Sequence, residues 1–66
     1  MNYIVTKNAL GHIVQTVHCS PVRLIADAAA LQYADEYHAV EIWGGDEQGP
    51  KGAYAHTVFI SGKRIT

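Results

Sequence analysis

The sequence predicts an α+β fold: a two-layer sandwich in which one helix packs on a four-stranded, mainly antiparallel sheet, in the order ββαββ. Three observations support this prediction. Two runs rich in strand-forming residues open the chain, an alanine- and leucine-rich segment follows a Ser-Pro pair, and two further strand-like runs come after it. Because 66 residues are enough for one small core, we expect residues 1–66 to form a single domain.

The first two predicted strands cover Asn2–Thr6 and Ile13–Cys19, where isoleucine, valine, threonine and tyrosine are frequent. Asn8 and Gly11 lie between them. Both residue types tolerate the positive φ angles that short reversing loops commonly require. We therefore expect these strands to form a β-hairpin.

A helix is predicted to begin at Ser20-Pro21, because a serine side chain can cap free backbone N–H groups and proline suits the first helical position. It is expected to run from Val22 to about Tyr37, a span without glycine or internal proline. Asp35 and Glu36 come late in this span, where the helix dipole disfavours acidic side chains.

Two apolar stripes lie on different sides of this predicted helix, so they cannot both face the sheet. We predict that the alanine and tyrosine stripe packs inward; it comprises Val22, Ala26, Ala29, Tyr33 and Tyr37. Leu24 and Leu31 are then at least partly exposed, and exposed apolar side chains on small domains often mark contacts. The alternative is that one of these leucines folds over the edge of the sheet.

The third and fourth strands are predicted at Ala39–Trp43 and Ala53–Ser61. Gly44–Gly52 contains four glycines and a proline, so a loop without regular structure is expected between them. Ser61-Gly62 predicts a last turn or bulge, after which the chain either extends the sheet briefly or frays.

A single helix covers only one face of such a sheet, so the opposite face is expected to be open to solvent or to a partner. Side chains alternate across a strand. If the aliphatic residues of the last two strands pack under the helix, Trp43 and Phe59 lie on the open face. The opposite register exposes the aliphatic residues instead, and the sequence leaves both registers open; the residues concerned are Val40, Ile42, Val58 and Ile60.

The charge balance disfavours a nucleic-acid partner, because five Lys and Arg against six Asp and Glu give a formal charge of -1. A single cysteine excludes an intrachain disulfide, and we expect a cytoplasmic protein. The sequence has no apolar run of membrane-spanning length and no signal-peptide pattern at its start, so no membrane partner is expected.

No cofactor, metal site or catalytic activity is predicted. The four histidines lack metal-ligand spacing, and the adjacent His18 and Cys19 of one strand would face opposite sides of the sheet. Cys19 precedes a predicted helix N-terminus, where thiolates are favoured, but a small buried cysteine is the commoner role.

The glycine-rich loop and the open sheet face supply the other candidate binding residues. Asp46 and Glu47 could meet a basic partner. Trp43, Lys51 and Tyr54 at the shoulders of the loop would be further contact residues. The complete set predicted for binding is Leu24, Leu31, Trp43, Asp46, Glu47, Lys51, Tyr54 and Phe59. The alternative for the loop is a plain connection between two strands.

In size and in its ββαββ order the whole chain resembles small inhibitor proteins that phages and other mobile elements encode, including some anti-CRISPR proteins. The resemblance implies a protein that occludes a host defence protein or complex by surface contact, and it transfers no role to an individual residue. The sequence thus predicts a protein-binding module with a host protein or complex as partner. Two alternatives stay open: a small RNA or single-strand binder that stacks bases on Trp43 and Phe59, and a structural homodimer formed through the open sheet face or through Leu24 and Leu31.

Overall fold

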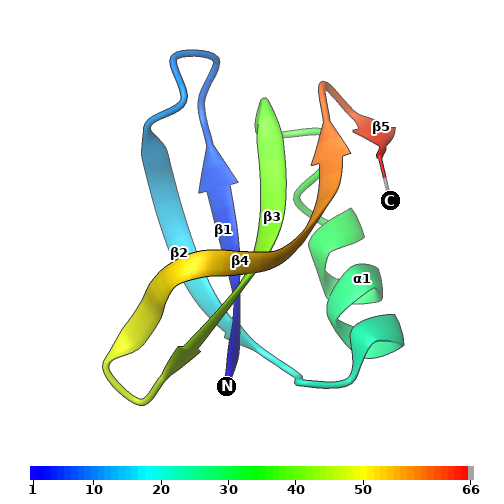
Figure 1. The fold of residues 1–66 in the computed structure, drawn as a ribbon. Coiled ribbons are helices and arrows are strands. Elements are labelled where there is room, and N and C mark those ends of the chain that lie inside the picture. The colour runs from blue at the N-terminus through cyan, green and yellow to red at the C-terminus, as the bar shows by residue number, and fades with distance from the viewer. Residues whose placement is uncertain (66) are drawn as a thin grey trace.

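The computed structural model describes residues 1–65, and for residues 52–57 it describes the backbone only. The chain forms one antiparallel sheet with one short helix against it (Figure 1). The elements are β1 (Asn2–Lys7), β2 (Ile13–Cys19), α1 (Arg23–Leu31), β3 (Ala39–Asp46), β4 (Gly49–Ile60) and β5 (Lys63–Arg64). Within the described residues the strand order across the sheet is β2-β1-β3-β4-β5.

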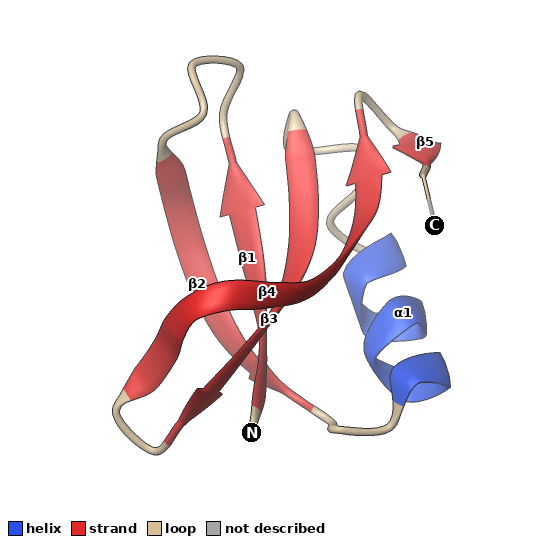
Figure 2. Cartoon of the chain, viewed as in Figure 1, coloured by secondary structure: helices blue, strands red, loops and turns tan. Residues whose placement is uncertain are grey.

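The predicted four-stranded sandwich is therefore wrong, because the sheet formed by the described residues has five strands. Figure 2 shows that strands make up most of this sheet-dominated α+β fold. The additional strand, β5, follows a tight turn in which Ser61 and Gly62 both have positive φ angles, 52° and 78°. This turn directs Lys63 and Arg64 back along the end of β4, where they pair with Ile60 and Phe59. The predicted turn at Ser61-Gly62 is confirmed.

The β1–β2 hairpin forms where the sequence predicts it, and β2 has the predicted bounds. Gly11 adopts a φ of 82°, as expected for a reversing turn. Asn8 acts differently from the prediction: its side-chain Oδ1 accepts hydrogen bonds from the backbone N–H groups of Leu10 and His12, both at 3.0 Å. An Asx-type side-chain bond, not a left-handed backbone, is thus its contribution to the turn.

The helix is shorter than predicted and begins differently. Ser20 Oγ accepts from Val22 N at 3.1 Å, one residue ahead of α1, and the N-cap residue Val22 has no side-chain cap. Beyond Leu31 the chain continues as a series of tight turns, with bonds such as Ala34 N to Leu31 O at 3.2 Å. Asp35 and Glu36 lie just past the helix end. If the helix continued to Tyr37, both acids would lie at its C-terminus, which is the negative end of the helix dipole.

The predicted loop at Gly44–Gly52 is also wrong, because most of these residues belong to β3 and β4. Asp46 pairs with Gly49, and Gly45 with Pro50, around a turn at Glu47-Gln48. Gly49 has a φ of 127°, which side-chain-bearing residues rarely adopt. Glycine here allows a tight hairpin where composition alone indicates an irregular loop.

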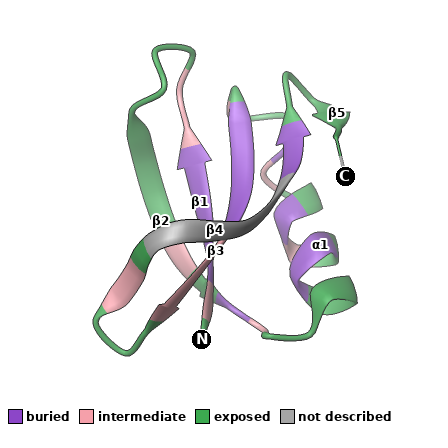
Figure 3. Ribbon diagram, in the orientation of Figure 1, coloured by how far each residue is buried: buried purple, intermediate pink, exposed green. Residues whose placement is uncertain are grey.

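The main core lies between α1 and one face of the sheet (Figure 3). Small residues on the inner side of the helix, such as Ala26 and Ala30, let it approach the sheet closely. The buried cluster comprises Ile4, Cys19, Ala26, Ala30, Ala34, Val40, Ile42, Val58 and Phe59, with Val17, Ala29, Tyr33 and Tyr37 packed at its margin. The predicted inward stripe is thus confirmed for the alanines and tyrosines, whereas Val22 is exposed.

The opposite face of the sheet is not open, contrary to the prediction. Tyr3 and Val5 alternate with Ile4, so they face away from the helix, yet both are buried. Irregularities in the β3–β4 register bend β4, which crosses in front of the other strands in Figure 1 and contacts β1 although β3 lies between them.

Candidate functional site

The outward side of α1 carries the most exposed large apolar residues of the helical segment. Leu24 is 80% exposed, Leu31 59% and Ile25 57%. Leu24 and Leu31 are seven residues apart and lie on one side of the helix, and Ile25 extends the patch laterally. We call these three residues the helix surface. The predicted exposure of Leu24 and Leu31 is confirmed.

Ile25 was not among the predicted binding residues. Ile25 lies about 100° from Leu24 around the helix, outside the line of Leu24 and Leu31. It is three residues after Val22 and four before Ala29, so helical spacing places it beside the inward stripe. The sequence therefore holds no clear signal that Ile25 is exposed.

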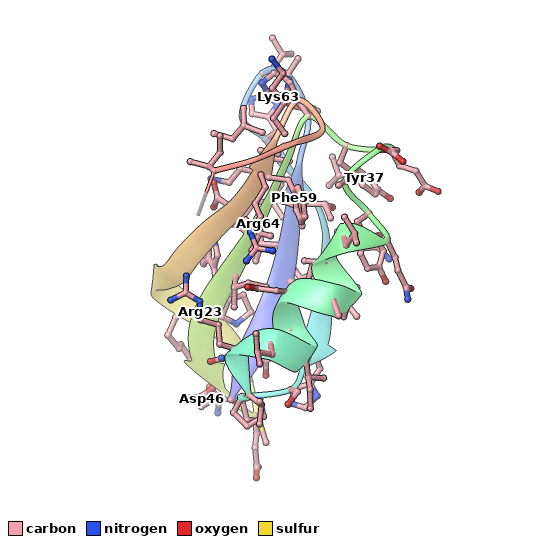
Figure 4. All side chains as sticks on the ribbon, turned by 90° about the vertical axis from the view of Figure 1, so that its right-hand side faces the viewer. Arg23, Tyr37, Asp46, Phe59, Lys63 and Arg64 are labelled. Carbon is pink, nitrogen blue, oxygen red and sulfur yellow. The ribbon has the colours of Figure 1, made fainter. Side chains whose placement is uncertain are left out.

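Charged side chains anchor the helix and flank the helix surface. Asp27 is buried on the sheet side and accepts a hydrogen bond from Arg64 Nη2 at 2.9 Å. Figure 4 labels Arg64 and Arg23 beside the helix. Arg23 Nε lies 4.0 Å from the same carboxylate, one helical turn away. Asp35 and Glu36 are exposed beyond the other end of the helix. The helix surface therefore has a basic group at its start and two acids past its end.

Trp43, a second predicted binding residue, belongs to a small polar cluster on the face of the sheet away from the helix. Its indole Nε1 donates to Glu41 Oε1 at 2.7 Å. Lys7 Nζ lies 3.2 Å from the same carboxylate oxygen and 5.4 Å from the centroid of the Trp43 ring. The indole is thus only partly exposed, with a cation beside its ring.

The acidic residues predicted for binding lie at the tip of the β3–β4 hairpin. Asp46 and Glu47, with Gln48, line a shallow depression there. Asp46 Oδ1 accepts from Gln48 N at 2.8 Å, and the Tyr3 hydroxyl donates to the Asp46 carbonyl oxygen. Lys51 Nζ donates to Gln48 Oε1 at 3.3 Å. The hydrogen bonds that Asp46 accepts therefore give this residue a structural role at the hairpin tip. The tip lies apart from the helix surface.

Phe59 is not a surface residue, so the prediction that it lies on an open sheet face is wrong. It is 5% exposed and belongs to the core beneath α1. The register explains the error: Val40 pairs with Phe59 and Glu41 with Thr57, so Val58 is an extra residue that shifts the alternation. The remaining predicted residue, Tyr54, pairs with Trp43 along the backbone, and its side chain lies outside the described part of the structure.

Cys19 is buried in the core at the end of β2. Burial raises the pKa of its thiol, so the protonated form is favoured in the folded chain. Among the residues whose side chains are described, no three His, Cys, Asp or Glu side chains gather closely enough to hold a metal ion. Within residues 1–65, no helix combines the length and apolar character needed to cross a bilayer.

The burial of Cys19 predicts that its thiol reacts slowly with reagents in solution. At neutral pH, a disulfide reagent should modify Cys19 in the folded chain at least about a hundredfold more slowly than in denaturant, because reaction waits for local opening. Since the folded state holds the thiol proton more tightly, the stability from this burial is present at neutral pH and falls as the pH rises above the ordinary pKa of 9.0. Absorbance of the released thiolate measures both rates, and a thiol that reacts equally fast when folded would contradict the prediction.

Comparison with known proteins adds no relative. No protein-family model, no characterised protein and no solved structure matches the chain.

Proposed function

We propose that this protein is a non-catalytic binding module that contacts a protein partner through the helix surface of Leu24, Ile25 and Leu31. The single observation that carries the proposal is the exposure of large apolar side chains along the outward side of a helix whose inner side is mostly alanine. Leu24, Ile25 and Leu31 on the outward side are not part of the core of this chain. Large apolar side chains gathered in one exposed patch are typical of interaction sites.

The chemistry of the surface defines the partner that fits it. A short amphipathic helix is commonly bound in an apolar groove of another protein. Asp35 and Glu36 are exposed beyond the end of α1, so a groove with basic side chains at that end would complement them. More specifically, we propose that the protein is an inhibitor of phage or mobile-element type that occupies such a groove on a host defence protein or complex.

Binding of single-stranded nucleic acid, the alternative, receives less support. It would use Trp43 and Phe59 as a stacking platform, but Phe59 is in the core beneath α1 and Trp43 is on the other face of the sheet. The Lys7 ammonium near the indole is paired with the Glu41 carboxylate, so its positive charge is largely neutralised where a phosphate backbone would pass. The protein-contact reading is therefore the better supported of the two.

The proposal predicts that Leu24→Asp abolishes partner binding and that Leu10→Asp does not. The two leucines are equally exposed, at 80% and 79%, but Leu10 lies in the β1–β2 turn. A charge at the centre of an apolar contact typically costs more than about 2 kcal/mol, or roughly thirtyfold in affinity. Purification of tagged variants from host cells, followed by calorimetry with the purified partner, measures the effect.

An infection assay in host cells with an active defence system tests the inhibitor form of the proposal. Expression of the unaltered chain and of Leu10→Asp should restore phage growth, and expression of Leu24→Asp should not. A partner retained equally by both variants would contradict the role of the helix surface. Partner binding without any effect on infection would contradict only the inhibitor form.

A further inference from the structure

The two edges of the sheet are built differently. At one edge β5 has two residues, Lys63 and Arg64, both exposed and both positively charged. At the other edge β2 has seven residues, Ile13–Cys19, with no charged side chain and no proline. Proteins normally protect an edge strand from pairing with other chains by shortening it or by adding charges, prolines or bulges. One edge of this sheet carries two of these protections, and the other has only a bulge at Val14.

The β2 edge is also accessible. In the described part of the chain, β2 pairs with β1 along one edge, and no strand pairs with its other edge. Most of its residues are exposed, and only Cys19 at its end is buried. The helix packs against β1, β3 and β4. From Gln15 to Cys19 the strand pairs regularly with β1, so its outer side presents an extended backbone that another strand can follow.

We infer that β2 binds β2 of a second copy of this chain, in antiparallel orientation about a two-fold axis, so that the two sheets join into one. The axis passes the middle of the strand at Thr16, which places Thr16 opposite its counterpart, Gln15 opposite Val17 and Val14 opposite His18. Threonine pairs across antiparallel strands are favourable. This inference does not depend on the helix surface, which lies on a different element.

A second copy fits this edge for two reasons. Antiparallel pairing about a two-fold axis is self-complementary, so the same strand supplies both sides of the interface. Identical strands also carry identical charges, and β2 contains no Asp, Glu, Lys or Arg, so no such charges repel each other across the joined strands. The exposed apolar side chains of Ile13 and Val14 become partly covered in the joined sheet, which favours association.

Light scattering behind size exclusion tests the inference, from about 10 μM to about 1 mM, because an interface of one strand pair is small. The unaltered chain should shift from monomer to dimer over this range. Thr16→Lys should stay monomeric, since it places two ammonium groups opposite each other. Gln32→Lys, which adds the same charge at an exposed position at the end of α1, should dimerise like the unaltered chain.

Amide hydrogen exchange of the unaltered chain gives a second readout that does not depend on any variant folding. Exchange in Ile13–Cys19 should slow as the concentration rises, while exchange at the β5 edge should not change. A strict monomer at 1 mM, or a dimer that Thr16→Lys leaves intact, would overturn the inference. A dimer lost in Leu24→Asp but kept in Thr16→Lys would also overturn it, and partner binding by the helix surface would still be measured separately.

Discussion

Replacement of Ile42 by alanine is expected to lower the free energy of unfolding by about 2 to 5 kcal/mol. Ile42 is fully buried in β3, opposite Ile4 of β1, and both belong to the core beneath α1. Loss of its methyl groups removes buried apolar area and leaves a cavity that close packing cannot fill. A chain of 66 residues has a total stability of roughly 3 to 10 kcal/mol, so this one change removes a large part of it.

Ile25→Ala is the matched control, because it makes the same chemical change at a residue that is 57% exposed. Its effect should stay within about 0.5 kcal/mol. Thermal unfolding followed by circular dichroism compares the two, and each kcal/mol corresponds to about 4 to 8 °C in a domain of this size. Equal losses in the two variants would mean that the outward side of α1 belongs to a core, and the helix surface would lose its basis.

Local patterns in the sequence are sufficient to locate most of the elements but not their lengths. The β-branched run at Ile13–Cys19 coincides with β2, because a strand and its turn depend on residues close together in the chain. The extension of β3 depends on longer-range contacts. Gly45, for example, is held in the sheet by a backbone hydrogen bond to Met1 O at 2.8 Å, which no local pattern reveals.

The prediction of which sheet face each side chain lies on fails for a related reason. Strict alternation predicts that Phe59 and Val58 face opposite sides, yet both are buried in one cluster because the register shifts between Val40 and Glu41. A bulge depends on how two strands fit together and leaves no clear signal in either strand. The exposure of Leu24 is different, because it follows from its position on the helix relative to the alanine stripe, which the sequence does display.

Gly45→Ala is expected to destabilise the fold by about 3 kcal/mol, at the upper end of the cost of overpacking. A Cβ atom at Gly45 would overlap the carbonyl oxygen of Gly49 and lie 2.7 Å from Pro50 Cα. These are backbone atoms of the facing strand, so no side-chain rotation relieves the clash. Gly45 cannot move away either, because its N–H is bonded to Met1 on the other side. The end of the β3–β4 hairpin must therefore open.

Gly11→Ala provides the control, since an added Cβ there meets no atom within 4 Å. It should cost only the strain of a left-handed backbone, about 1 to 2 kcal/mol. Chemical denaturation gives the two energies, and amide chemical shifts locate the change: near Met1 and the β3–β4 turn for Gly45→Ala, and in the β1–β2 turn for Gly11→Ala. If Gly45→Ala costs no more than Gly11→Ala, then Gly45 and Pro50 are not close neighbours. In that case the region from Gly44 to Gly52 would be a loop after all, and the bend of β4 over the sheet would need another origin.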